Sequence, residues 1–144
     1  MASFFRIIKK ERIIEKKKIL VIDDEPHICT ILQNFLEEAE FEVLVATNGK
    51  EGIEIAKEQN PDAILLDIKM PEINGIEVCS ILKEDPTTKN ILIFMLSALS
   101  RMGDMEDALK VGADGYFTKP FDRAIVEKIK HRLTKLSKKK SKGI

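Results

Sequence analysis

Cysteine and histidine are scarce in this chain of 144 residues, which contains two of each. His27 and His131 lie far apart in the sequence and offer no zinc-ligand spacing. Cys29 and Cys79 fall on the apolar faces of expected helices. We therefore predict two buried free thiols rather than a disulfide or a metal pair.

Long apolar runs are also missing. The longest extend for only a few residues, too short to span a bilayer. Arg6, Lys9 and Lys10 interrupt the N-terminal stretch, which therefore lacks the apolar core of a secretory signal. Because 44% of the residues are hydrophobic and 33% are charged, we expect one soluble, cytoplasmic domain with a substantial core.

The chain also lacks a net charge, because 24 Lys and Arg balance 24 Asp and Glu. The two signs of charge are nevertheless unevenly distributed along the sequence. Residues 1–18 carry a net +5, residues 135–144 a net +5, and residues 19–134 a net −10. The negative charge of residues 19–134 argues against the binding of nucleic acid by this region. In residues 1–17, apolar pairs alternate with basic clusters. We favour a solvated helix or arm here, and a helix on a membrane surface or on a partner is the alternative.

Short apolar segments alternate five times with helix-like segments. This alternation is typical of a parallel sheet that is covered by helices on both faces. A chain of this length suits the flavodoxin-like (βα)5 doubly wound fold, with strand order 2-1-3-4-5. The expected strands are 18–22, 41–46, 63–67, 91–96 and 114–118. The expected helices follow Pro26 and Gly49, begin near Gly75, span 104–111, and begin after a cap at Asp122.

Acidic residues stand at the ends of two of these strands. A single strand-ending carboxylate more often caps a turn, but Asp23 and Asp24 follow the first strand and Asp67 ends the third. These strands are neighbours at the switch point of the expected sheet, so the three carboxylates should converge on one crevice. Their mutual repulsion favours a bound cation, and oxygen ligands without His or Cys suit Mg²⁺. With Lys119 and the Ser97 hydroxyl nearby, such a site can bind a phosphoryl group, and Asp67 is the candidate nucleophile.

These motifs resemble the receiver domain of two-component response regulators, over roughly residues 18–137. The five strand–helix units fall in register with the family's pattern. On this resemblance, residues 1–17 form a basic amphipathic extension and residues 138–144 a Lys-rich tail. The matching residues are Asp23, Asp24, Asp67, Met70, Pro71, Gly75, Ser97, Ala98, Tyr116, Lys119 and Pro120.

The resemblance also implies a role for each site residue. Asp67 would accept a phosphoryl group from a phosphohistidine on a sensor histidine kinase or phosphotransfer protein. Lys119 would pair with the phosphoryl oxygens, and the peptide bond before Pro120 would be cis. The Mg²⁺ ligands would be the carboxylates of Asp23, Asp24 and Asp67 and the backbone carbonyl of Lys69.

The remaining residues would surround the phosphoryl pocket and relay its state. Ser97 would bond one phosphoryl oxygen, and Ala98 would leave room for the group. Lys69 and Leu99 lie two residues past Asp67 and Ser97, so they should flank the mouth of the pocket. Ser97 would then move away from the space beside Tyr116, and that ring would turn from solvent toward the core.

The expected output is a change in protein binding. The surface that changes would be the fourth helix, fifth strand and last helix, roughly residues 104–137, where we place a downstream partner. Only a Lys-rich tail follows the last helix, so we expect no DNA-binding domain in this chain and no direct DNA binding. The domain would assist its own phosphorylation and dephosphorylation rather than act as an enzyme on other substrates.

Three other functions fit the sequence less well. A haloacid-dehalogenase-type phosphatase needs a second acid two residues after the strand-end Asp, where this chain has Lys69, and a cap domain. A flavodoxin-like cofactor binder needs a hydroxyl- and glycine-rich phosphate loop, where Asp23, Asp24 and Glu25 would repel phosphate. A receiver that has lost its phosphorylation would lack a site residue, and none is missing here.

Overall fold

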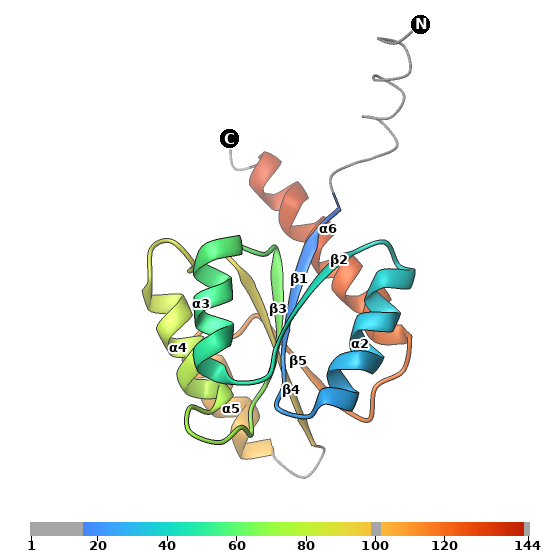
Figure 1. Cartoon of the computed structure of the whole chain (residues 1–144). Coiled ribbons are helices and arrows are strands. Elements are labelled where there is room, and N and C mark those ends of the chain that lie inside the picture. The colour runs from blue at the N-terminus through green and yellow to red at the C-terminus, as the bar shows by residue number, and fades with distance from the viewer. Residues whose placement is uncertain (1–15, 99–101, 143–144) are drawn as a thin grey trace, which may run out of the picture.

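The computed structural model of the chain describes residues 16–98 and 102–142 (Figure 1). Leu99 and most of the basic N-terminal extension therefore lie outside the described residues. The predictions that the extension is amphipathic and that Leu99 flanks the phosphoryl pocket stay predictions.

Five parallel strands form a single sheet in the order β2-β1-β3-β4-β5. This order and the helices that cover the sheet confirm the predicted doubly wound α/β fold. The strands are β1 (Lys18–Ile22), β2 (Glu42–Ala46), β3 (Ala63–Asp67), β4 (Leu92–Ala98) and β5 (Gly115–Lys119). The helices are α2 (Pro26–Glu38), α3 (Gly49–Gln59), α4 (Gly75–Glu84), α5 (Met102–Lys110) and α6 (Ala124–Lys142).

The helices cover the two faces of the sheet unequally. α3, α4 and α5 pack on one face, through a core that includes Ala56, Val78 and Ala108. α2 and α6 pack on the other face, through a core that includes Leu32 and Ile129. Because both faces are covered, the three central strands read as continuous apolar runs rather than as alternating ones.

Several element boundaries differ from the prediction by one or more residues. The fourth strand was expected to end at residue 96, but β4 continues through Ser97 and Ala98, because these residues still pair with Thr118 and Lys119 of β5. β5 correspondingly begins and ends one residue later than expected. The helix predicted over 104–111 is α5, which begins earlier and ends at Lys110.

Several local predictions are confirmed. Cys29 and Cys79 are free and buried. The Asp122 carboxylate accepts a hydrogen bond from the backbone N–H of Ala124 at 2.8 Å, which caps the start of α6. The peptide bond between Lys119 and Pro120 is cis. Among the helices of the described residues, none has both the length and the apolar character to cross a membrane.

The last helix crosses the boundary that the sequence predicted between the receiver domain and the Lys-rich tail. α6 runs without a break from Ala124 to Lys142, and Figure 1 shows its final turns projecting past the sheet. The boundaries at 17/18 and 137/138 stay predictions.

Candidate functional site

The strand order brings the ends of four strands together at the carboxyl edge of the sheet. Asp67 is the last residue of β3 and pairs in register with Leu96 of β4. Asp23 immediately follows β1, the other neighbour of β3, and its backbone N–H donates to the carbonyl of Ala46 at 3.1 Å. Lys119 ends β5 on the far side of β4. Residues separated by as many as 96 positions in the sequence thus meet at one edge.

The Lys119 ammonium joins two carboxylates at this edge. Its Nζ lies 3.2 Å from Asp23 Oδ2 and 3.4 Å from Asp67 Oδ1. Both carboxylates are buried, with Asp23 fully covered and Asp67 only 4% exposed. Asp23 also accepts a hydrogen bond from the backbone N–H of Glu25 at 2.9 Å. The ends of the first and third strands therefore converge as predicted, and the partly buried Lys119 ammonium joins their carboxylates.

Burial dominates the electrostatics of these groups. Removal from water raises the pKa of Asp67 to about 7, and the charge of Asp23 adds to this rise while Lys119 opposes it. Burial likewise raises the pKa of Asp23, against the opposing effects of the Glu25 N–H and of Lys119. For Lys119, burial acts to lower the pKa, but the charges of Asp67 and Asp23 outweigh it and raise the pKa. The single positive charge of Lys119 therefore does not neutralise both of the carboxylates that it contacts, Asp23 and Asp67.

A group of adjacent acidic residues at the same edge has the donor set of a hard-cation site. One carboxylate oxygen from each of Asp23, Asp24 and Glu25 lies within 4.8 Å of the others. Oxygen ligands of this kind, one of them on the buried Asp23 and the others open to solvent, fit Mg²⁺. Asp67 is not a member of this group. Its predicted role as a metal ligand stays a prediction, as does that of the Lys69 carbonyl.

The loop after β3 is packed directly against the backbone of Asp67. The N–H of Gly75, at the start of α4, donates to the carbonyl of Ile68 at 2.8 Å. A Cβ at position 75 would lie 2.2 Å from the carbonyl oxygen of Asp67, so a residue without a side chain is required. A capping box between Asn74 and Glu77 fixes the same helix end. The position of Asp67 is thus set by α4 as well as by the sheet.

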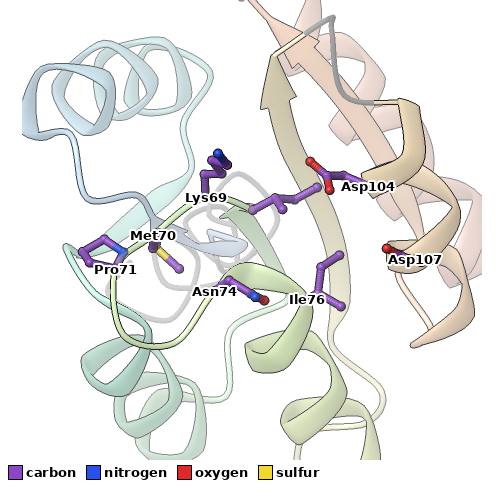
Figure 2. Close-up of a pocket in the computed structure, with 8 residues that line it drawn as sticks. Lys69, Met70, Pro71, Asn74, Ile76, Asp104 and Asp107 are labelled. Atoms are coloured by element: carbon purple, nitrogen blue, oxygen red, sulfur yellow. The ribbon is translucent and has the colours of Figure 1, made fainter.

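A cavity of about 570 Å³ opens beside this loop. Figure 2 shows Lys69, Met70 and Asn74 on the loop side and Asp104 and Asp107 across from them on α5. Ile68 and Ile76 also line it. Lys69 is exposed, and its predicted place at the mouth of the phosphoryl pocket stays a prediction.

The other predicted residues lie near the strand ends in different environments. Ser97 is 3% exposed, and its hydroxyl lies 3.5 Å from the carbonyl oxygen of Ala98. Ala98, the next residue, is exposed. Tyr116 is half-buried on β5 beside Met95 and packs against the core under α3, α4 and α5. Pro120 is exposed at the carboxyl end of β5.

Two features of the site were not predicted. Glu25 was expected only to repel phosphate, although a third consecutive acid after the strand also indicates a further metal ligand. The cavity beside Lys69 could not be read from the sequence, because it depends on how α5 packs against a loop some thirty residues earlier.

The sequence of the chain matches known proteins over the same region. Residues 19–130 match the family described as "Response regulator receiver domain". The alkaline phosphatase synthesis transcriptional regulatory protein PhoP of Bacillus subtilis (strain 168) is 44% identical over 105 residues, which cover 73% of this chain and 43% of that protein. The DNA-binding dual master transcriptional regulator RpaA of Synechocystis is 40% identical over 105 residues, covering 73% and 44%. The chain thus spans less than half the length of these relatives.

Solved structures agree. A response regulator receiver domain protein (CheY-like) from Methanospirillum hungatei JF-1 superposes with a TM-score of 0.81 at 27% identity, over 87% of this chain and 99% of that one. The receiver domain of a sensor histidine kinase from Pseudomonas aeruginosa PAO1 has a magnesium ion coordinated in its active site cleft. It superposes with a TM-score of 0.75 at 28% identity, over 82% and 97%. By its fold, its strand-end acids and these matches, the chain belongs to the response regulator receiver domain family of two-component systems.

Proposed function

We propose that this domain is a phosphorylation switch, in which Asp67 accepts a phosphoryl group from a phosphohistidine of a sensor histidine kinase or phosphotransfer protein. The observation that carries the proposal is the partly buried Lys119 ammonium, which contacts the buried carboxylates of Asp67 and Asp23 at the switch point of the sheet. A phosphoryl group brings further negative oxygens to this position, and a fixed cation lowers the cost of placing them there.

In the transfer, a carboxylate oxygen of Asp67 forms a bond to phosphorus as the bond between phosphorus and the histidine nitrogen breaks. The electron pair of that bond returns to the imidazole. Lys119 holds Asp67 in place and neutralises charge on the phosphoryl oxygens. Asp23, Asp24 and Glu25 supply the oxygen ligands for Mg²⁺, with Asp67 and the Lys69 carbonyl as further candidates. Bound Mg²⁺ supplies additional neutralisation of the phosphoryl oxygens.

The proposed readout lies along β5 and the helices beside it. Ser97 is buried at the carboxyl end of β4, one strand from Tyr116. A bond from its hydroxyl to the phosphoryl group would draw the end of β4 toward Asp67. The half-buried Tyr116 ring would then have space to turn inward. Hollows of about 280 and 410 Å³ flank β5 and α6 and offer recesses for a downstream protein.

Phosphorylation is tested with acetyl phosphate and Mg²⁺, by measuring an acid-stable, base-labile phosphate on the full chain. We expect labelling of the wild type and none of Asp67→Asn. Asp62→Asn is the matched control, because Asp62 is an exposed acid near the other end of the same strand. Equal labelling of Asp67→Asn and Asp62→Asn would move the acceptor elsewhere.

The switch is tested through Tyr116, the single tyrosine of the chain, whose ring resonances are therefore unambiguous by NMR. Adding beryllofluoride and Mg²⁺ should shift them in the wild type. The shift should be lost in Ser97→Ala, while Mg²⁺ binding measured by calorimetry should be lost in Asp24→Asn and kept in Ser97→Ala. A full response of Tyr116 in Ser97→Ala would place the coupling on another route.

A further inference from the structure

The acidic residues that follow β1 are held from two sides by the first turn of α2. We call Asp23, Asp24 and Glu25 the acidic turn; one carboxylate oxygen of each lies within 4.8 Å of the others. Three like charges this close repel one another, and the repulsion favours a more open turn. Contacts that keep the acidic turn in its present shape therefore favour the binding of a cation.

Pro26 constrains the last residue of the acidic turn. It is the first residue of α2, and it is exposed. The ring of a proline disfavours the helical region for the residue before it. Glu25 is accordingly extended, with φ −96° and ψ 106°, and its backbone N–H donates to the Asp23 carboxylate at 2.9 Å. Pro26 thus favours the conformation of Glu25 that closes the turn onto Asp23.

Cys29 holds the other end of the acidic turn. Its side chain is buried under α2, and its thiol donates to the carbonyl oxygen of Asp23 at 3.3 Å. The N–H of Asp23 donates to the Ala46 carbonyl, just past the end of β1. A thiol is a weak donor, but a carbonyl in a buried position loses free energy when it has no partner. The backbone of Asp23 is therefore fixed to both β2 and α2.

We propose that Pro26 and Cys29 are positioning residues for the cation site, because they hold the acidic turn in a shape that binds Mg²⁺ more tightly than a free turn would. This inference rests on the proposed function, in which the acidic turn supplies oxygen ligands. Neither Pro26 nor Cys29 is itself a ligand. They act through the backbones of Glu25 and Asp23, by reducing the conformational entropy that cation binding must remove.

A purely structural role for Cys29 predicts a different pattern. Cys29 belongs to the core under α2 and α6, so loss of its side chain lowers stability whether or not the thiol positions Asp23. The melting temperature alone therefore does not identify the role. The affinity for Mg²⁺ does, when it is measured on the folded protein.

The test is the dissociation constant for Mg²⁺, measured by titration calorimetry on the full chain, with the melting temperature of each variant recorded in EDTA. Cys29→Ala removes the donor and should weaken Mg²⁺ binding by about threefold, as for one weak hydrogen bond. Cys29→Ser supplies a donor again and should recover most of the affinity. Cys79→Ala is the matched control: Cys79 is also buried, but in the core on the other face of the sheet, with its Sγ 4.0 Å from the Val111 carbonyl.

Pro26 also has a matched control in the chain. Pro26→Ala leaves Glu25 free to adopt other backbone conformations and should weaken Mg²⁺ binding by about threefold. Pro86→Ala is the same change at another exposed proline, which follows the extended Asp85 at the end of α4. Both substitutions should lower stability slightly, because a proline restricts the unfolded chain at either position. Pro86→Ala should bind Mg²⁺ as the wild type does.

Equal Mg²⁺ affinities in Cys29→Ala and Cys79→Ala would overturn the role of Cys29, even if both variants were less stable than the wild type. An affinity of Cys29→Ser no better than that of Cys29→Ala would overturn it as well. Equal affinities in Pro26→Ala and Pro86→Ala would overturn the role of Pro26. If the wild type itself bound no Mg²⁺, the cation site of the proposed function would fail. Wild-type binding with unchanged variants would reject the positioning role alone, so the two failures are distinguishable.

Discussion

Replacing Gly75 by alanine should destabilise the domain through one contact. The added Cβ would lie 2.2 Å from the carbonyl oxygen of Asp67 and 2.8 Å from the Cα of Ile68. Both are backbone atoms, so no side-chain rotation relieves the clash. The start of α4 must therefore move by about 1 Å away from β3, which also strains the 2.8 Å hydrogen bond from Gly75 to Ile68.

The cost combines overpacking, about 1–3 kcal/mol, with the weakening of a hydrogen bond worth about 1 kcal/mol. For a domain of this size the total corresponds to a fall in Tm of roughly 10 °C. Because the contact is with Asp67 itself, labelling by acetyl phosphate should also slow by at least about tenfold at a temperature where the variant is folded.

Gly103→Ala is the matched control. A Cβ at position 103, in the first turn of α5, meets nothing within 4 Å. Alanine is also the better helix former, so this variant should be unchanged or more stable by at most about 1 kcal/mol. Thermal unfolding by circular dichroism compares the two. If Gly75→Ala and Gly103→Ala had the same Tm, the packing of α4 against the backbone of Asp67 would not contribute to stability as we expect.

Three further outcomes are expected. Burial raises the pKa of the Cys29 and Cys79 thiols to about 11, so neither should react with Ellman's reagent in the folded protein at about pH 8. The free energy of unfolding should fall as pH rises from the ordinary thiol value toward that pKa, because only unfolded chains then release the protons. Lys83 donates to Asp114 at 2.8 Å and to two carbonyls, so Lys83→Met should cost about 2 kcal/mol, less than for a fully buried pair. Lys69→Ala should change the lifetime of the phosphoryl group more than the rate of its formation, because Lys69 is exposed on the loop after Asp67, where we expect an attacking water to approach.

Each of these outcomes has a control in the same chain. Both thiols should react quickly in denaturant, and reaction in the folded state at the same speed would contradict their burial. Lys57→Met removes an ion pair with Asp85 in which the lysine is 48% exposed, against 16% for Lys83, and should cost less than about 1 kcal/mol. Equal losses in Lys57→Met and Lys83→Met would refute the special role of Lys83. Lys89→Ala, at an exposed position before β4 and so at the other edge of the sheet, should leave phosphoryl decay unchanged, and the same decay in Lys69→Ala would contradict the prediction.

The strands could be predicted because parallel strands buried on both faces consist of continuous apolar runs. Ala63 to Leu66 form such a run, and Asp67 ends it where the chain turns out of the sheet. The strand order then followed from the length and the alternation, and it placed Asp23 and Asp67 together. The extension of β4 through Ala98 was missed, because a serine and an alanine give no strand signal and only pairing with β5 keeps them in the sheet.

The details of the site were harder to predict because they depend on packing between distant elements. The sequence motif identified Gly75, but not its approach to the Asp67 carbonyl, which requires α4 and β3 to be in place. The bond from Lys119 to Asp23 spans 96 residues. Local patterns identified which side chains matter, while their distances and their pKa values came only from the folded chain.

The topology also separates the points where extensions attach from the proposed phosphoryl site. In a sheet whose strands are all parallel, the first strand begins at the amino edge, and the ligand crevice lies at the carboxyl edge. A helix that follows the last strand and covers the sheet runs back antiparallel to it, so α6 also ends at the amino edge. Residues added before Lys18 or after the last turn of α6 therefore attach far from Asp67. They can acquire a binding role of their own without changing the groups that we propose to hold the phosphoryl oxygens. Substitutions in the loop after β3 have no such freedom, because Lys69 and Gly75 lie against the site itself.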